Sequence, residues 1–575
     1  MNQSEAKKPL AHFEDFVHSI LQDWKVPGAA VAIIQNDEIL LSQGFGQRNR
    51  AEGLEVTSET LFPIGSCTKA FTTAAMALLV DEGRLDWDTP VKAYLPSFKL
   101  YDNFATERLT PRDLVSHRSG LPRHDLMWYN STHTRKELFD RLQYLEPNKD
   151  LRQLWQYQNL MYMVAGYLVG ELTGQTWEEF VQKRIFEPLG MTQSFFSIEQ
   201  AREQGQCSHP YIHLNDEVKE MAFYAAQGAI APAGAIVSSI KDMSRWISLQ
   251  TNGGKIGETQ LISEAQIAQM HSPQMVMPET NKYAELTNST YGMGWFLHTY
   301  RGHKMVEHGG NIDGFSSLVT ILPQKNIGIV VLTNLQVNPV PSILTYNIID
   351  RLLGLEAVPW NERFRKEFDE MKAAGTKGKE KSEEDRVQGT SPSHPLEAYT
   401  GDFEHPGYGT ISITENGGQL KVIFNSMELP LKHYHYDVFD ATVEKFDLTI
   451  KMSFFTNTRG DIDTLSAPME SAVKDIVFKR VPNKQMTEKS FLEPFTGIYE
   501  VMDMQMIVAF KSEHTLSVSM PGQPAFELVP YKGTEFQVKG LSGSRIEFKR
   551  DESGTITEAI IIQPGGAITA TKKTK

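Results

Sequence analysis

The sequence predicts an α+β protein in which a large layered domain precedes two small antiparallel β-barrels. Helical periodicity alternates with hairpin patterns up to about residue 355. A charge-dense segment begins near residue 358, and an internal repeat fills the remainder of the chain. The 575 residues also exceed what one compact core usually holds, so several domains are expected.

Helices and hairpins alternate in the first domain. Residues 10–24 place apolar side chains on one helical face, and residues 27–46 form two apolar runs around a polar turn. Residues 66–83 and 157–174 are predicted helices, each ended by a glycine at the C-cap position. Residues 307–334 predict two long strands around a Pro-Gln-Lys-Asn turn. Outer helices with antiparallel strands are typical of a layered α+β domain.

Composition changes sharply after the first domain, which we place at residues 1–357. Residues 358–394 are rich in charge and poor in aliphatic side chains, so they predict a charged linker with a short helix at its start. The two β-barrels are expected at residues 395–485 and 486–575.

The two barrels are predicted from a repeat. "LEAYTGDFE" at 396–404 recurs as "LEPFTGIYE" at 492–500, and Leu420 and Val422 have counterparts at the same offset. Matches spread in the same order along both copies indicate duplication of one unit. Each copy is long enough for a small barrel of about eight strands.

Charge and composition exclude several classes of function. The net charge of −14 disfavours a nucleic-acid partner, since phosphate neutralisation needs clustered Lys and Arg. No apolar run approaches a membrane span, and the first residues show no secretory signal. A cytoplasmic protein is expected, or a secreted or periplasmic one if a leader was removed. Cys67 and Cys207 are expected to be reduced thiols.

Ser66 and Lys69 lie three residues apart at the start of an apolar helix. A helix places them on one face about one turn apart, so a neutral amine there could accept the serine proton. The apolar run after Lys69 gives a solvated lysine few polar neighbours. The pattern is common by chance, and a simple helix start with Ser66 as N-cap is the alternative interpretation.

Two further motifs occur in order: Tyr157-Gln158-Asn159 and His308-Gly309-Gly310. Alone, the first would be a turn at a helix start, and the second a surface histidine beside a bulge. With Ser-x-x-Lys, they make residues 10–355 resemble the serine β-lactamase/penicillin-binding-protein superfamily. The resemblance is to its class C-like branch of D-peptidases and esterases (peptidase S12). It implies an αβα catalytic domain with an antiparallel sheet and a helical subdomain.

The resemblance implies three catalytic roles. Ser66 would be acylated, Lys69 would help to deprotonate it, and Tyr157 would act as general base and then protonate the leaving group. A tyrosine suits that role only if nearby lysine charge stabilises its phenolate. The resemblance implies no metal and no organic cofactor.

The remaining site residues would hold the substrate. Asn159 would bind Lys69 and the substrate amide, while Gly309 and Gly310 would leave room for substrate backbone. The N–H groups of Ser66 and Asn311 would form the oxyanion hole. β-Lactamases and carboxypeptidases carry lysine where this chain has His308, and a neutral imidazole pairs weakly with a carboxylate. Aminopeptidase, amidase or esterase action is therefore favoured over β-lactam hydrolysis.

The overall architecture is similar to D-aminopeptidase and to related serine hydrolases with lipocalin-like C-terminal domains. In D-aminopeptidase a barrel loop reaches the active site, and residues 500–506 are one candidate for such a loop here; a role in assembly or stability is the alternative. The predicted substrates are small D-amino-acid peptides or amides. An esterase or acyl transferase, and a non-catalytic penicillin-binding sensor, are the rival functions. A homo-oligomer is compatible with the resemblance.

Overall fold

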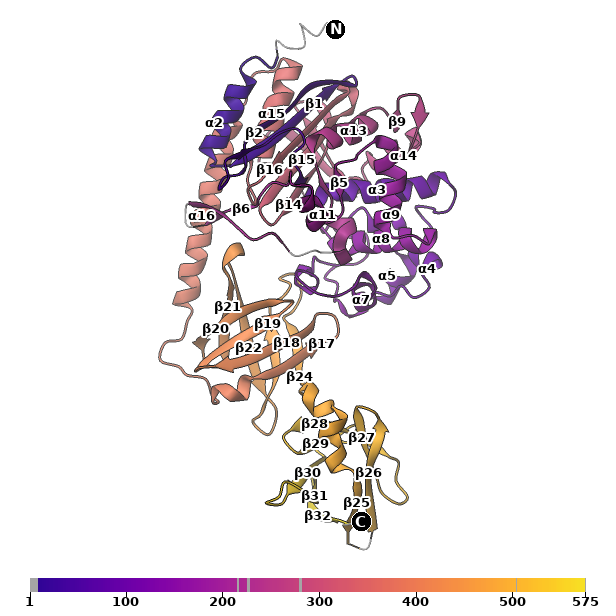
Figure 1. The fold of residues 1–575 in the computed structure, drawn as a ribbon, viewed down its shortest axis with the longest axis vertical. Coiled ribbons are helices and arrows are strands. Elements are labelled where there is room, and N and C mark those ends of the chain that lie inside the picture. The colour runs from indigo at the N-terminus through magenta and orange to yellow at the C-terminus, as the bar shows by residue number, and fades with distance from the viewer. Residues whose placement is uncertain (1–8, 215–216, 225–227, 279–281, 503, 574–575) are drawn as a thin grey trace.

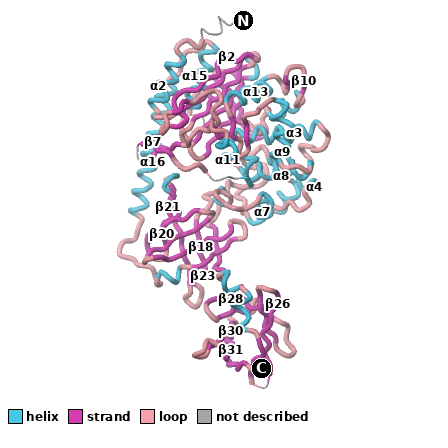
Figure 2. The backbone as a smooth tube through the Cα atoms, in the orientation of Figure 1, coloured by secondary structure: helices cyan, strands magenta, loops and turns pink. Residues whose placement is uncertain are grey.

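The computed structural model describes residues 9–214, 217–224, 228–278, 282–502 and 504–573. Figure 1 shows three bodies in a row: a large domain of helices and sheet, a first barrel below it, and a second barrel at the far end. The tube in Figure 2 shows that strands dominate both barrels, whereas the large domain is mixed. The predicted α+β class with two C-terminal barrels is confirmed.

The large domain is built on an antiparallel sheet. Among the described residues, nine strands pair in the order β11-β12-β13-β14-β15-β16-β1-β2-β3. Their bounds are β1 (Gly28–Gln35), β2 (Glu38–Asn49), β3 (Leu54–Glu55), β11 (Met275–Val276), β12 (Leu286–Tyr291), β13 (Phe296–Tyr300), β14 (His303–Ile312), β15 (Phe315–Leu322) and β16 (Ile327–Thr333). The first and last segments of the domain thus meet at the centre, where β1 pairs with β16.

Helices cover both faces of this sheet. The apolar side chains of β1 alternate, so that Val31 and Ile33 pack with α2 (Phe13–Asp23) and α15 (Val340–Leu353). Ala30 and Ala32 face the other core, which holds α3 (Thr68–Asp81), α8 (Asn159–Thr173) and α13 (Ile240–Thr251). The shorter helices of the domain are α4 (Val91–Tyr94), α5 (Asn103–Arg108), α6 (Pro111–Leu114), α7 (Arg135–Arg141), α9 (Trp177–Val181), α10 (Glu187–Leu189), α11 (Ile198–Glu203), α12 (Ala231–Gly234) and α14 (Glu264–Met270).

The two predicted helices that carry motifs are present as α3 and α8. A short 3₁₀ turn (Gly65–Cys67) leads into α3, which is buried along nearly its whole length. The side chain of Gln158 caps α8 by accepting the N–H of Leu160 at 2.8 Å, and Gly174 ends it with φ 71°. The two helices pack together in the core, which brings their N-termini to one place.

The expected charged linker is mostly helical. The helix α16 (Trp360–Glu384) extends much further than the short helix predicted there. Its Glu, Lys, Arg, Met and Ala residues are strong helix formers, and together they outweigh Gly375 and Gly378. Trp360 anchors its start in the core beside α15, while most of its remainder is exposed.

Both predicted barrels close. In the described part of the chain, each has eight antiparallel strands. The first comprises β17 (Gly401–His405), β18 (Gly409–Asn416), β19 (Gln419–Phe424), β20 (Met427–His435), β21 (Val438–Val443), β22 (Leu448–Thr456), β23 (Ile462–Ala467) and β24 (Ile476–Val481). The second comprises β25 (Gly497–Val501), β26 (Met504–Ser512), β27 (Thr515–Ser519), β28 (Phe526–Lys532), β29 (Glu535–Val538), β30 (Arg545–Arg550), β31 (Ile556–Gln563) and β32 (Gly566–Lys572). The repeated nonapeptide plugs each barrel with buried aromatics, Tyr399 and Phe403 in one and Phe495 and Tyr499 in the other.

The two barrels differ in what they contact. The core of the first barrel is continuous with that of the large domain, whereas the second barrel has a core of its own. The β25–β26 hairpin holds residues 500–506, of which Asp503 lies outside the described residues, and Figure 1 places it far from the large domain. That candidate loop therefore does not reach the site described below. None of the described helices has the length and apolar character needed to cross a membrane.

Candidate active site

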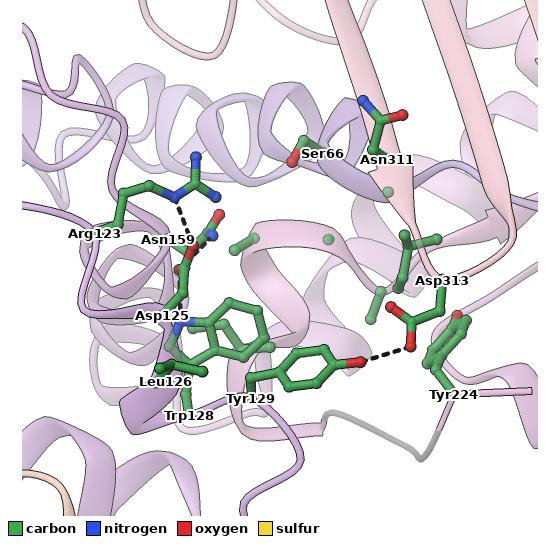
Figure 3. A pocket seen from close by; sticks show the side chains of 16 residues that line it. Ser66, Arg123, Asp125, Leu126, Trp128, Tyr129, Asn159, Tyr224, Asn311 and Asp313 are labelled. Carbon is green, nitrogen blue, oxygen red and sulfur yellow. Dashed lines mark hydrogen bonds and ion pairs between the residues drawn. The ribbon is translucent and has the colours of Figure 1, made fainter. Parts of the chain in front are cut away.

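A cavity of about 290 Å³ opens beside Ser66, between the helical part of the large domain and the end of β14 (Figure 3). Its described lining residues come from both ends of the large domain. They are Gly65, Ser66, Arg123, Asp125, Leu126, Trp128, Tyr129, Asn159, Tyr224, Ile230, Ala233, Gly234, Ala235, Asn311, Ile312 and Asp313.

The turn that holds Ser66 is pressed against the end of β14. Gly65 has φ 51°, and a Cβ there would lie 2.9 Å from the backbone nitrogen of Asn311. Glycine suits this position both for its left-handed backbone and for the close approach. The backbone nitrogen of Asn311 therefore lies close to the turn that carries Ser66, as an oxyanion hole formed by these two residues would require.

Lys69 is fully buried and makes three polar contacts. Its Nζ lies 2.8 Å from Oδ1 of Asn159, 2.7 Å from the carbonyl oxygen of Ala233 and 3.0 Å from Oγ of Ser66. The first two partners can only accept, so they take the two N–H groups of a neutral amine. The lone pair of that amine then faces the hydroxyl of Ser66.

The surroundings of Lys69 favour that neutral form. Burial lowers the pKa of Lys69 well below its usual value, and the charge of Arg123 lowers it further. Asp125 acts in the opposite direction but does not outweigh burial. This environment thus favours the neutral amine of Lys69 over the cation.

Tyr157 precedes α8 and lies over the same lysine. Its ring centroid is 4.7 Å from Nζ of Lys69 and 4.9 Å from Cζ of Arg123. Burial raises the pKa of Tyr157 above its usual value, although a hydrogen bond with Ser66 and the charge of Arg123 oppose the rise. Burial thus favours the protonated phenol of Tyr157 and the neutral amine of Lys69, which agrees with the neutral lysine predicted from the apolar helix and disfavours a phenolate stabilised by a lysine cation.

His117, which the sequence analysis did not single out, holds Tyr157 in place. Its carbonyl oxygen accepts the N–H of Gln156 at 2.8 Å, and its Nδ1 accepts the N–H of Gln158 at 3.0 Å. The imidazole also packs on the Tyr157 ring, with centroids 4.3 Å apart. Burial lowers the pKa of His117 well below its usual value, which keeps Nδ1 free to accept. His117 is thus a positioning residue.

Asn159 connects the lysine to the charged wall of the cavity. Its Oδ1 accepts from Lys69, and its Nδ2 donates to Oδ1 of Asp125 at 3.0 Å. Asp125 also accepts from Nε1 of Trp128 at 2.9 Å and forms an ion pair with Arg123. The amide of Asn159 is therefore held in one orientation, with its polar atoms committed to protein partners.

His308 is buried and does not line the cavity. Its Nδ1 lies 2.7 Å from the carbonyl oxygen of Gly309, and its Nε2 lies 3.0 Å from the hydroxyl of Tyr291. Burial lowers the pKa of His308 to about 3. The side chain is therefore neutral. It packs behind the lining residues and presents no charge to the cavity. Cys67, a buried free thiol like Cys207, packs beside this strand, with its Sγ 3.1 Å from the carbonyl oxygen of His308.

The two glycines of the third motif are not equivalent. A Cβ at Gly310 would lie 1.9 Å from the carbonyl oxygen of Ile64, while one at Gly309 would meet nothing closer than 3.6 Å.

Replacing Gly310 with alanine should therefore push β14 away from the Ser66 turn. We expect Gly310→Ala to lower activity at least about a hundredfold and to destabilise the large domain by about 2 kcal/mol. Gly309→Ala is the matched control, and its kcat should stay within about threefold of wild type. Equal effects of the two variants in steady-state kinetics and thermal unfolding would contradict this account of the turn.

Several lining residues were not predicted from the sequence. Arg123 and Asp125 lie within residues 114–125, a segment to which the sequence analysis assigned no role. Tyr129, Asp313 and Tyr224 carry no recognisable local motif.

The first barrel supports the cavity wall. Asn425, in the β19–β20 turn, donates to the carbonyl oxygen of Leu126 at 2.7 Å. Glu470 accepts the N–H of His124 at 2.8 Å, and the hydroxyl of Tyr408 lies 2.7 Å from Nδ1 of His124. The segment that carries Arg123 and Asp125 is thus fixed from the side of the barrel.

Comparison with known proteins agrees with this geometry. The sequence model of the beta-lactamase family matches residues 13–352. The chain belongs to the beta-lactamase family. Its large domain has the fold of the serine hydrolases in that family. A second match, to a domain of unknown function (DUF3471), covers residues 385–480 and so includes nearly all of the first barrel.

One curated relative of this beta-lactamase-family chain is unguisins hydrolase ungD′ of Aspergillus campestris. The two are 29% identical over 420 residues, covering 70% of this chain and 77% of the relative. The match therefore extends beyond the large domain.

Two solved structures share the fold. The octameric penicillin-binding protein homologue from Pyrococcus abyssi has a TM-score of 0.54 at 20% identity, covering 90% of this chain and 99% of its own. The D-amino acid amidase from Ochrobactrum anthropi SV3 has a TM-score of 0.50 at 22% identity, covering 59% of this chain and 97% of its own.

Proposed function

We propose that this protein hydrolyses small D-amino-acid-containing peptides or amides through an acyl-enzyme at Ser66. The set of contacts around Lys69 carries the proposal. A buried amine with its two N–H groups engaged by obligate acceptors has its lone pair directed at a serine hydroxyl. A neutral amine in this position can accept the proton of the serine hydroxyl during nucleophilic attack, whereas a serine that only caps a helix needs no such neighbour.

In acylation, the neutral Lys69 accepts a proton first, and the protonated Tyr157 donates one afterwards. Oγ of Ser66 attacks the substrate carbonyl carbon while its proton moves to Nζ of Lys69. The N–H groups of Ser66 and Asn311 stabilise the oxyanion, a contribution of about 3 kcal/mol per donor. The hydroxyl of Tyr157 protonates the departing amine and is reprotonated from Lys69. Deacylation runs the same path with water in place of the amine, returning Lys69 to its neutral form.

The nature of the third motif supports the substrate class. His308 is neutral and is not among the lining residues of the cavity, so it offers no cation to a substrate carboxylate. Two similar proteins, an unguisins hydrolase and a D-amino acid amidase, are in keeping with a hydrolase, and the second is in keeping with an amide substrate. The octameric Pyrococcus homologue is in keeping with a homo-oligomer.

An esterase or acyl transferase of the same fold is the second candidate. The apolar side of the cavity, formed by Leu126, Trp128, Ile230 and Ile312, favours it because such a wall accommodates an acyl chain. The two candidates separate in a panel of D- and L-aminoacyl p-nitroanilides, p-nitrophenyl esters and nitrocefin. Hydrolysis of D-aminoacyl anilides supports the first, and turnover of esters alone supports the second. Rapid nitrocefin turnover would contradict the role given to His308.

The charged wall should tune the acid limb of the pH profile. A neutral Lys69 is needed, so kcat/KM should rise with pH through the lowered pKa of Lys69 and stay high above it. Arg123 lowers this pKa and Asp125 raises it. We expect Arg123→Gln to move the acid limb up by roughly one pH unit, and Asp125→Asn to move it down. Shifts in the same direction for both variants would show that the limb belongs to another group.

A further inference from the structure

The cavity ends at a second ion pair, far along the chain from the first. Oδ2 of Asp313 accepts from the hydroxyl of Tyr129 at 2.6 Å and from Nζ of Lys445 at 2.8 Å. Lys445 also bonds to the hydroxyl of Tyr129 and lies 5.0 Å from the centre of its ring. Figure 3 shows Tyr129 and Asp313 joined at this end, with Tyr224 beside them. A carboxylate, a phenol and an amine are thus bonded to one another, with a second phenol beside them.

The amine of this cluster comes from the first barrel. Lys445 lies in the turn Glu444–Phe446 that joins β21 to β22. Nε2 of Gln336, in the large domain, donates to the carbonyl oxygen of Lys445 at 3.4 Å, which helps to hold the turn against the cavity. The barrel therefore adds a charged group to a site whose other walls belong to the large domain.

The pair decides the charge of this end of the cavity. Arg123, Asp125 and Asp313 are the charged groups among the described lining residues. Arg123 and Asp125 pair with each other, and Lys445 matches Asp313, whose side chain is 8% exposed. A substrate ammonium placed here would compete with Lys445 for the carboxylate of Asp313. Whichever cation lost that contact would be left unpaired, which is costly at a buried site.

An uncharged polar group fits the same place better. Tyr224 lines the cavity, and its buried hydroxyl has no hydrogen-bond partner among the described residues. A buried hydroxyl without a partner costs free energy, and an amide or hydroxyl of a ligand would remove that cost. The unpartnered phenol beside a neutralised carboxylate thus points to a neutral hydrogen-bonding group.

We propose that Asp313, Tyr129, Tyr224 and Lys445 form a subsite for an uncharged polar group of the substrate. Lys445 is its specificity-determining residue, because it cancels the charge that would otherwise attract a free α-ammonium. The enzyme then acts on blocked or internal acyl-amino groups rather than on free amino termini. This rests on the proposed hydrolase function, and it replaces the aminopeptidase expectation with an amidase that needs no amino terminus.

The test compares matched substrates that differ only in charge. N-acetyl-D-phenylalanine p-nitroanilide and D-phenylalanine p-nitroanilide are compared at about pH 6.5, where the free amine is mostly protonated. The corresponding methyl esters serve if anilides are not cleaved. The ratio of kcat/KM for the blocked over the free substrate cancels the titration of Lys69. We expect wild type to favour the blocked substrate, and Lys445→Met to shift the ratio at least about tenfold toward the free ammonium.

Two further variants separate charge from docking. Asp313→Asn with Lys445→Met should restore a ratio close to that of wild type, since neither charge remains. Asn425→Ala removes a different barrel contact without changing charge, and it should leave the ratio unchanged. A ratio that Lys445→Met does not move, or that Asn425→Ala moves equally, overturns the subsite. Absence of any Ser66-dependent turnover overturns the hydrolase itself and the subsite with it, so the two failures are distinguishable.

Discussion

Replacing Ser66 with alanine is expected to lower kcat at least about ten-thousandfold on whichever ester or amide the wild-type protein cleaves. The side chain supplies the bond-forming oxygen, and no other described hydroxyl is in contact with Lys69 Nζ. The measurement is steady-state turnover of wild type and Ser66→Ala at matched concentrations, with labelling by a fluorophosphonate probe in parallel.

Loss of folding must be separated from loss of the nucleophile. Alanine retains the backbone N–H at position 66 and removes only the hydroxyl, so thermal unfolding and substrate binding should stay near wild type. Retained labelling of Ser66→Ala at the wild-type rate would place the nucleophile elsewhere.

The second large effect is expected at Lys69. Lys69→Met keeps the length and apolar stem of the side chain but removes the proton acceptor, and we expect a loss of about a thousandfold or more in the rate of Ser66 acylation. It also leaves Oδ1 of Asn159 and the carbonyl oxygen of Ala233 without a partner, which costs about 1–3 kcal/mol of stability.

Lys69→Arg provides the sharper comparison. A guanidinium can donate to both oxygens but stays protonated, so it cannot accept the serine proton. It should therefore be as slow as Lys69→Met in stopped-flow acylation assays. Wild-type rates in Lys69→Arg would show that position 69 acts only by holding its neighbours.

The parts of the site that could be predicted are those with a local pattern. Ser66 and Lys69 share a helix face because of their spacing, and Gln158 begins the helix that carries Asn159. The inward turn of His308 could not be predicted, since it depends on a hydrogen bond to Tyr291 from another strand. The neutral form of Lys69 could be predicted from its apolar helix, whereas the raised pKa of Tyr157 depends on burial that only the packed structure reveals.

The same division holds for the fold. The repeat predicted both barrels because each copy fills its barrel with buried aromatic residues at the same two positions of the repeat. The length of α16 was missed because dense charge is typical of both linkers and exposed helices, and here the spacing of good helix formers decided the outcome. The link between Asp313 and Lys445 had no sequence signal, since the two are in different domains.

The most direct test of the account is to trap the acyl-enzyme. The wild-type protein is mixed with a slowly hydrolysed ester or amide, quenched in acid within milliseconds to seconds, and examined by intact-mass and peptide mass spectrometry. We predict a mass increase equal to one acyl group, located on the peptide that contains Ser66 and absent from Ser66→Ala. Turnover without any adduct, or an adduct on another residue that persists in Ser66→Ala, would contradict the account.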